Sequence, residues 1–353
     1  MNKFSLSLVL TVLTTLVICA DCSKTPDNQK VADIEIAAAN LKMFQPLPQS
    51  VPSNSNEITE EKTTLGRMLY YEPRLSKSQK ISCNSCHILD KFGVDGQATS
   101  DGHNGQKGSR NAPTVYNAAG HFVQFWDGRA ADVETQAKGP VMNPVEMAMP
   151  SEKRVTAVLK SMPEYVQAFE KAFPGQKDPV SYENMAKAIG AFERKLITPS
   201  RWDKFLRGDS QALSNEEKFG FLDFTQTRCQ ACHSGAYVGG NMYQKLGLAK
   251  PWPDTSDVGR EKITKNVSDR MMFKVPGLRN IAQTMPYYHD GKVQTLEEAV
   301  SRMAEFQLGD SLDDGQVNSI VTWLKTLTGD IPTEYIKQPV LPKSTAATPK
   351  PEM

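Results

Sequence analysis

The stretch Cys83-Asn84-Ser85-Cys86-His87 recurs as Cys229-Gln230-Ala231-Cys232-His233, with two cysteines three positions apart and a histidine directly after the second. On one helical turn, residues i and i+3 point the same way, so both thiols can reach one flat cofactor. C-x-x-C-H is the attachment motif of c-type haem, and its histidine is an axial ligand of the iron. The sequence therefore predicts two covalently bound haem c groups, attached at Cys83, Cys86 and His87 and at Cys229, Cys232 and His233.

Two other uses of paired cysteines fit this spacing less well. A zinc site built from two C-x-x-C pairs usually separates them by about 15 to 20 residues. Here residues 86 and 229 are far further apart. A thioredoxin-like redox pair is expected within a βαβ pattern, and none surrounds either motif. Haem attachment remains the interpretation that uses both histidines.

Length and net charge limit the number of domains and the kinds of partner that the chain can have. The 353 residues suffice for two domains with separate cores, and 41 Lys and Arg balance 40 Asp and Glu. No overall electrostatic attraction to nucleic acid or to an anionic membrane is expected. Any charged docking surface for a partner must be local.

The N-terminus has the layout of an export signal. Met1-Asn2-Lys3 precedes a mostly apolar run from Phe4 to Ile18, which is shorter than the roughly 20 residues of a membrane span. We expect residues 1–20 to be a signal peptide and the mature protein to be periplasmic. Lipidation of Cys22 is the alternative that would attach the protein to a membrane. Asp21 disfavours it, because a lipoprotein signal has a small residue there.

Most of the chain is expected to be helical, with long loops. Apolar residues recur at helical spacing in 151–173 and 181–196, and a last helix is expected at 312–327. Capping-box patterns at Ser214-Asn-Glu-Glu217 and Thr295-Leu-Glu-Glu298 open two more helices. Strand-like alternation is scarce. The predicted fold class is all-α, with two cytochrome c-like haem domains and long loops.

The same pattern predicts five segments along the chain. Polar, proline-containing residues flank the two haem regions, and the C-terminal end lacks the apolar residues that a packed core needs. The segments are a signal peptide at 1–20, a leader packing on the fold at 21–48, an N-terminal haem domain at 49–196, a C-terminal haem domain at 197–335 and a disordered tail at 336–353.

Around the cysteine motifs, the chain resembles the bacterial di-haem cytochrome c peroxidases of the MauG/CCP superfamily over roughly residues 45 to 330. The resemblance rests on short motifs that are specific in combination. They are Ser82 to His87, Gly93-Val-Asp-Gly96, Gly102-His103, Gln106-Lys-Gly108, Arg110-Asn-Ala-Pro-Thr114, Phe125-Trp-Asp-Gly-Arg-Ala130, Gln136-Ala-Lys-Gly-Pro140, Lys274-Val-Pro276, Leu278-Arg-Asn280, Pro286-Tyr-Tyr-His-Asp-Gly291, and Met303 before Gln307-Leu-Gly309.

The resemblance implies that hydrogen peroxide is reduced at the first haem. Residues 49–196 become the low-potential, peroxidatic domain, with His87 as the proximal ligand and His103 as a distal ligand that leaves on activation. Glu146 matches the family's catalytic glutamate, and Gln136 matches the neighbouring hydrogen-bonding glutamine. Taken without the resemblance, His103 is equally an exposed histidine in a glycine-rich loop, and Glu146 is an ordinary surface carboxylate.

For the second haem, the resemblance implies the high-potential, electron-receiving centre in residues 197–335. His233 is then the proximal ligand and Met303 the distal ligand, and a methionine thioether raises the potential of the iron. His289 is a rival ligand by residue type and is otherwise a structural group. Trp126 matches the aromatic residue that lies between the two haems in the family.

Partners and a further metal also follow from the resemblance. It implies a small electron donor, a cytochrome c or a cupredoxin, and a homodimer. It also implies one Ca²⁺ ion held by Asn111 and the carbonyls of Thr284 and Pro286. Two other functions stay open. One is a pure electron-transfer protein with both irons permanently six-coordinate, and the other is a MauG-like oxidase of a protein substrate, whose relatives place a tyrosine at the position of Met303.

Overall fold

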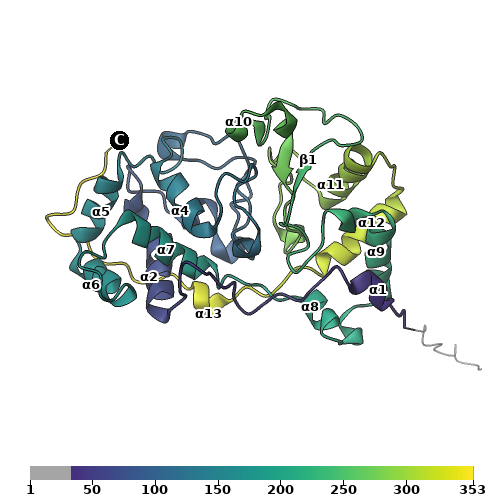
Figure 1. The fold of residues 1–353 in the computed structure, drawn as a ribbon, viewed down its shortest axis with the longest axis horizontal. Helices are drawn as coiled ribbons and strands as arrows, with labels where there is room; N and C mark the ends of the chain where they lie inside the picture. The colour runs from purple at the N-terminus through teal and green to yellow at the C-terminus, as the bar shows by residue number, and fades with distance from the viewer. Residues whose placement is uncertain (1–32, 353) are drawn as a thin grey trace, which may run out of the picture. The chain divides into compact units, whose positions relative to one another are not determined.

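The computed structural model describes residues 33–352 (Figure 1). The predicted signal peptide at 1–20 and residues 21–32 of the predicted leader, with Cys22, therefore lie outside the described residues. The chain divides into two compact units, Met1–Ile34 and Glu35–Met353, and the second unit contains both cysteine motifs. The predicted boundary between two haem domains at residue 196 stays a prediction.

The described residues are mostly helical, with a single two-stranded antiparallel sheet that pairs Tyr243 with Lys274. This agrees with the predicted dominance of helices. In chain order the elements are α1 Ala38–Leu41, α2 Glu60–Tyr70, α3 Cys83–Cys86, α4 Val133–Met142, α5 Glu152–Lys160, α6 Pro163–Ala172, α7 Tyr182–Glu193, α8 Arg201–Leu206, α9 Asn215–Gln226, β1 Tyr243–Lys245, α10 Glu261–Thr264, β2 Met272–Lys274, α11 Leu296–Arg302, α12 Asp314–Lys325 and α13 Thr333–Ile336.

Both halves of the second unit use the same helix packing around a cysteine motif. In the first half, α2 precedes the first motif and packs closely on α7. In the second half, α9 precedes the second motif and packs closely on α12. A glycine lies at each contact. A Cβ atom on Gly66 would be 1.9 Å from the carbonyl oxygen of Ala188, and one on Gly220 would be 2.0 Å from that of Ser319.

Two hydrophobic cores correspond to these helix pairs. Leu65, Leu69 and Phe192 belong to the first core, which α2 and α4 to α7 surround. Trp202 and Trp323 belong to the second, and each is 0% exposed. Burial of large apolar side chains at about 25 cal/mol per Å² is the main stabilising contribution in each half. Each haem motif is thus attached to a separate core.

The described end of the predicted leader contacts the second core through Phe44. The Phe44 ring makes edge contacts with Trp202 and Phe221 at centroid distances of 5.7 and 5.3 Å. Leu47 is 2% exposed, and its backbone N–H donates to Asp203. These contacts fix residues 44–47 against the fold.

The structure differs from the predicted disorder of the C-terminal tail. After α13 the chain returns to the first half and runs beside α5 and α6 (Figure 1). Arg74 donates to the carbonyl of Pro342 at 2.8 Å and to Ser344 at 2.9 Å. Glu352 pairs with Arg154 at 2.9 Å. Beyond Ile336, which is buried in the first core, the tail is held by hydrogen bonds and an ion pair, and its composition therefore predicted disorder.

One helix prediction also needs correction. The helical stretch 151–173 is two helices, α5 and α6, because Pro163 cannot donate a backbone hydrogen bond and instead begins a new helix. The helix predicted at 312–327 is α12, and a short α13 follows it. The two capping boxes are confirmed in part. Ser214 forms a complete capping box at α9, and Thr295 caps α11 by accepting from the Glu298 N–H.

Among the helices of residues 33–352, none combines the length and the apolar character needed to cross a bilayer.

The glycine at the α2–α7 contact gives a stability prediction. We expect Gly66→Ala to lower the free energy of unfolding by about 1–3 kcal/mol, because the added methyl group has to push α7 away. Gly315→Ala is the matched control, since Gly315 is exposed in the first turn of α12 and alanine favours helix by up to about 1 kcal/mol. Chemical denaturation of the holoprotein measures both. Equal stability of the two variants would contradict this account of the contact.

Candidate functional site

The first cysteine motif forms a single helical turn, α3, with its histidine directly after it. Ser82 and Ser85 close a capping box at its start, and the His87 N–H donates to the Cys83 carbonyl at 3.0 Å. Tyr70 of α2 donates its hydroxyl to the His87 carbonyl at 2.8 Å. The core helix α2 therefore fixes the backbone of the histidine, as a metal ligand requires.

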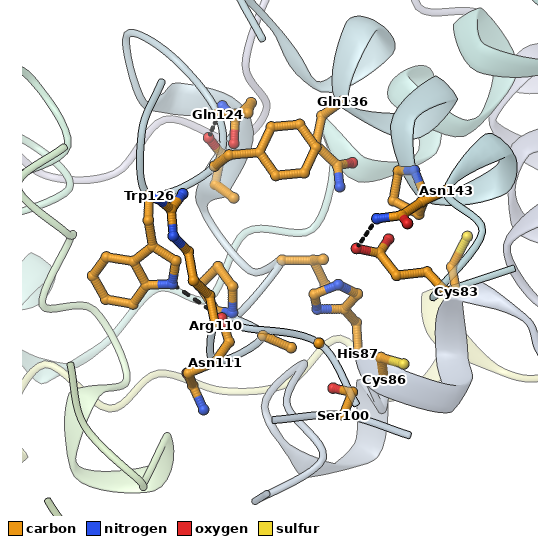
Figure 2. Close-up of a pocket in the computed structure, with 18 of the residues that line it drawn as sticks. Cys83, Cys86, His87, Ser100, Arg110, Asn111, Gln124, Trp126, Gln136 and Asn143 are labelled. Carbon is orange, nitrogen blue, oxygen red and sulfur yellow. Dashed lines mark hydrogen bonds between the residues drawn. The ribbon is translucent and has the colours of Figure 1, made fainter. Parts of the chain in front are cut away.

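Next to this motif the fold encloses a cavity of about 530 Å³, within the range of sites that bind small molecules and cofactors. Figure 2 shows the His87 imidazole pointing into it, with Trp126 and Cys83 on opposite sides of the view. Most of the wall comes from the first half, and part comes from the second. The wall includes residues from segments 81–87, 100–102, 107–115, 118–129, 133–147, 189–193, 262–263 and 274–277.

The residues at this cavity fit a haem c group. Cys83 and Cys86 are free thiols on its wall, one helical turn apart. The Nδ1 atom of His87 is buried and has no hydrogen-bond partner. Burial lowers the pKa of His87, which favours the neutral imidazole that binds a metal. His87 would hold the haem iron, and the bound haem would supply redox chemistry at this cavity.

Glu146 lies in the wall of the same cavity, half-buried. Its carboxylate accepts a hydrogen bond from the Asn143 side-chain amide at 2.8 Å, the dashed line beside Asn143 in Figure 2. Burial raises the pKa of the Glu146 carboxyl, and Arg129 and the Asn143 hydrogen bond oppose this rise. Gln136, from α4, lines the cavity as well. The structure thus brings Glu146 and Gln136 into one cavity with His87.

His103 is buried rather than exposed, with 6% of its surface accessible. Its backbone N–H donates to the carbonyls of Val145 and Glu146 at 3.0 and 2.8 Å, and its Nδ1 atom has no partner. An ion pair of 2.7 Å between Asp101 and Lys107 closes the loop that carries it. The interpretation of His103 as an exposed loop histidine is therefore wrong. The loop lies directly against the Glu146 segment.

Trp126 lies where the two halves meet. Its indole N–H donates to the Asn111 carbonyl at 3.0 Å, and its own carbonyl accepts from the Lys274 N–H at 2.8 Å. The ring lines the first cavity and also packs against the aromatic cluster of Trp252, Met271 and Phe273 in the second half. One side chain therefore contacts both the first cavity and this cluster of the second half.

The second cysteine motif is half-buried, and its histidine lies close to the backbone of neighbouring residues. The Nδ1 atom of His233 has no hydrogen-bond partner, and burial lowers its pKa to about 4. A Cβ atom on Gly239 would be 3.2 Å from that Nδ1 and 2.3 Å from the Pro276 carbonyl oxygen. Gly239 has φ +127°, a conformation that L side chains rarely adopt, so this approach requires glycine.

Met303 packs against the same aromatic cluster as Trp126 and begins a stretch of π-helix, Met303–Leu308. Such stretches are rare and occur often at functional sites. His289 is 4% exposed and packs between the rings of Trp126 and Phe273, at centroid distances of 6.4 and 4.5 Å. This gives His289 a packing role next to Trp126.

The three residues expected to bind calcium are not all joined by contacts. The Asn111 amide donates to the Gln97 carbonyl at 2.9 Å, and the Asn111 N–H donates to the His289 carbonyl at 2.8 Å. Among the described residues, no hydrogen bond joins Asn111 to Thr284 or Pro286. The hydrogen bond to the His289 carbonyl brings the segment of Asn111 near the segment of Thr284 and Pro286.

Among the ionisable residues in the wall of the first cavity to which sequence reasoning assigned no role, three have a pKa that burial shifts. They are Lys274, His121 and Glu193. Burial raises the pKa of Glu193 to about 8 and lowers that of Lys274 to about 8. Lys274 stood in the quoted motif Lys274-Val-Pro276, which was the only signal in the sequence. The positions of Glu193 and His121 follow from helix packing and loop paths that spacing does not reveal.

Two C-x-x-C-H motifs on a helical fold, one of them opening on a cofactor-sized cavity, define a di-haem c-type protein. Comparison with known proteins agrees. A sequence model of the family described as "Di-haem cytochrome c peroxidase" matches residues 60–211. The chain is 45% identical to a cytochrome c551 peroxidase of Pseudomonas aeruginosa over 88% of its length and 90% of that protein.

A cytochrome c551 peroxidase of Nitrosomonas europaea is also 45% identical, over 90% of this chain and 93% of that protein. Among solved structures, a MauG-like protein associated with microbial copper homeostasis matches with a TM-score of 0.73 and 28% identity, over 83% of this chain and 97% of that one. The chain belongs to the di-haem cytochrome c peroxidase family. It is therefore an oxidoreductase of the peroxidase type with two haem c groups.

Proposed function

We propose that the chain reduces hydrogen peroxide to water at its first haem, with electrons delivered one at a time by a small redox protein. Two electrons and two protons convert one hydrogen peroxide into two water molecules. The observation that carries the proposal is the Glu146 carboxyl in the wall of the cavity that also holds His87. A proton donor and acceptor beside the haem is what breaking the peroxide bond requires and what pure electron transfer does not.

Within this proposal, Glu146 moves a proton between the two oxygens of the substrate. The Asn143 amide orients the carboxylate, and Gln136 offers a second amide to the substrate from α4. The raised pKa of Glu146 supports this role, because a carboxyl that gains a proton more easily can both accept and return one.

We assign the iron ligands as His87 and His103 for the first haem and His233 and Met303 for the second. Support for His103 comes from its burial and its unpaired Nδ1 atom. Support for Met303 comes from its packing against the same cluster as Trp126 and from its position at the start of a π-helical stretch. Trp126 is then the connection for electrons between the high-potential second haem and the low-potential first haem.

Three further features belong to the proposal. Asn111 and the carbonyls of Thr284 and Pro286 would hold one Ca²⁺ ion, since calcium prefers oxygen ligands and Asn111 is 9% exposed at the junction of the two segments. The donor is a cytochrome c or a cupredoxin. The mature protein is exported to the periplasm and forms a homodimer, without a lipid on Cys22.

The test is peroxide-dependent oxidation of a reduced small cytochrome c by the purified holoprotein with calcium present, before and after reduction by one electron. If His103 must leave the first haem, the wild type turns over rapidly only after reduction. His103→Gly then turns over in both states, because no imidazole has to be displaced. Both proteins are checked by absorbance for two attached haems.

Other outcomes decide against parts of the proposal. A His103→Gly variant that still needs prior reduction shows that His103 is not the group that leaves. Absence of turnover by the wild type in both states, with two haems attached, favours an electron-transfer protein or an oxidase of a protein substrate.

A further inference from the structure

Lys274 is a buried lysine that reaches from one half of the fold to the haem cavity of the other. It is the last residue of β2, and its backbone N–H donates to the Trp126 carbonyl at 2.8 Å. The residue is 6% exposed and lines the cavity that holds Cys83, Cys86 and His87. Its backbone is therefore fixed while its side chain faces the first haem site.

The charge of Lys274 has no carboxylate partner. Its Nζ atom is 3.2 Å from the Nδ1 atom of His121, and within residues 33–352 it makes no ion pair. The neighbouring arginines of the wall differ in this respect. Arg110 pairs with Asp127 and Asp257 at 2.6 Å, and Arg129 pairs with Asp127 at 3.0 Å.

His121 is held in place on the other side of this lysine. A Cβ atom on Gly240 would be 2.2 Å from the His121 ring, and one on Gly277 would be 2.7 Å from its Nε2 atom. Burial first, and then the charge of Lys274, lower the pKa of His121, so the ring is neutral and Nδ1 can accept from the ammonium group. Burial lowers the pKa of Lys274 to about 8, which still leaves the amine mostly protonated at pH 7.

A buried cation without a counter-ion is unfavourable unless a ligand supplies the opposite charge. The ligand of this cavity does so, because a haem group carries two propionate carboxylates. Arg110, the other cationic side chain of the wall that is largely buried, already has carboxylate partners. Lys274 is therefore the cation that is free to bind a propionate.

We propose that Lys274, positioned by His121, binds a propionate carboxylate of the haem attached at Cys83 and Cys86. Lys274 is a positioning residue: it fixes the first haem against β2, the strand whose backbone also holds Trp126. The inference rests on haem attachment at the first motif. It does not depend on peroxide reduction, because the ion pair exists in the resting holoprotein.

The ion pair has a measurable consequence for the potential of the first haem. A positive charge that compensates a propionate favours the reduced iron, so its removal should lower the potential. We expect Lys274→Met to decrease the equilibrium constant for reduction of the first haem about tenfold, which corresponds to about 59 mV for one electron. Lys274→Arg keeps the charge and should keep most of the potential.

Spectroelectrochemical titration of the holoprotein without peroxide measures both potentials, and absorbance confirms two attached haems. Lys262→Met is the matched control, because Lys262 lines the same cavity but is exposed, where solvent screens its charge. We expect this control to leave both potentials unchanged. We also expect Lys274→Met to leave the second haem at its wild-type potential.

An unchanged first potential in Lys274→Met with both haems attached would overturn the proposal. So would a shift confined to the second haem. Should this variant fail to fold or to attach haem, a crystal structure of the wild-type holoprotein decides instead. A Nζ atom within about 3 Å of a propionate oxygen supports the ion pair, and a separation above about 4 Å contradicts it. The outcome is independent of turnover, so loss of the proposed peroxidase function would not mimic it.

Discussion

Glu146→Gln is expected to lower peroxide turnover by about 10²- to 10⁴-fold while both haems stay attached. Cleavage of the bond between two oxygens leaves one oxygen that must gain a proton, and the substrate has to lose one first. A carboxyl group beside the reacting oxygens can carry out both transfers. Glutamine has the same shape but cannot exchange a proton in this way.

The surroundings of Glu146 make the substitution a clean test. Its carboxylate accepts from Asn143, and a glutamine carbonyl oxygen can accept the same hydrogen bond. The backbone carbonyl of Glu146 accepts the His103 N–H, a contact that no side-chain change removes. The cavity wall should therefore keep its form, and the loss should appear in the rate of the chemical step.

Steady-state oxidation of a reduced cytochrome c by peroxide gives the rate, and the absorbance of both haems shows that the protein is intact. Glu170→Gln serves as the control, because Glu170 is exposed on α6, outside the cavity wall. It should retain wild-type turnover. Wild-type activity in Glu146→Gln would mean that another group moves the proton, and Gln136 would then have no catalytic partner.

Much of this fold was predictable because its strongest signals are local. The two cysteine motifs occupy only a few residues each, and their geometry follows from a single helical turn. The caps at Ser214 and Thr295 are likewise set by residues three positions away. Periodicity correctly indicated helices at 181–196 and 312–327, whose apolar faces pack on α2 and α9.

The errors arose where distant residues decide the structure. The tail was predicted to be disordered because it lacks apolar periodicity, yet Arg74 donates to the carbonyl of Pro342, hundreds of residues away. Arg74 itself is oriented by buried Glu72 at 2.6 Å. No sequence pattern within the tail indicates that its carbonyl groups accept hydrogen bonds from the buried Arg74.

In the candidate site, too, some residues could be predicted from local spacing and others could not. Cys83, Cys86 and His87 are recognisable from spacing alone. His103 and Glu146 needed the resemblance to a family, because loop residues of these types are usually exposed. The structure buries His103 and places Glu146 in the cavity wall, and the His103 N–H donates to the Glu146 carbonyl. Neither residue spacing nor the resemblance to a family indicates the role proposed for Lys274, because this role depends on the absence of a carboxylate near its Nζ atom.

Arg279→Met is expected to lower the free energy of unfolding by roughly 3–5 kcal/mol. The Arg279 side chain is 2% exposed and that of Asp203 is 0% exposed. Two hydrogen bonds of 2.7 and 3.0 Å join the guanidinium to the carboxylate. Removing the guanidinium leaves a buried carboxylate without its cation, and this costs more than the ion pair contributes when both partners are present.

The other contacts of Asp203 explain why its carboxylate cannot rearrange locally when Arg279 is removed. Asp203 also accepts the backbone N–H groups of Leu47 and Ser200, each at 2.7 Å, so it cannot turn toward solvent without releasing the leader and the start of α8. Arg279 also donates to the Ala236 carbonyl at 2.9 and 2.7 Å. That carbonyl lies three residues after His233 in the chain.

Chemical denaturation of the holoprotein, followed by the absorbance of the second haem, measures the effect. Arg201→Met is the control, because Arg201 pairs with Glu217 at the surface, with 51% of its side chain exposed, and such a pair contributes at most about 1 kcal/mol. Arg279→Lys should give an intermediate loss, since lysine keeps the charge but cannot form both hydrogen bonds. If Arg279→Met is no less stable than Arg201→Met, the prediction is wrong. The carboxylate of Asp203 then does not need Arg279, and packing alone holds together the segments of Leu47, Ser200 and Arg279.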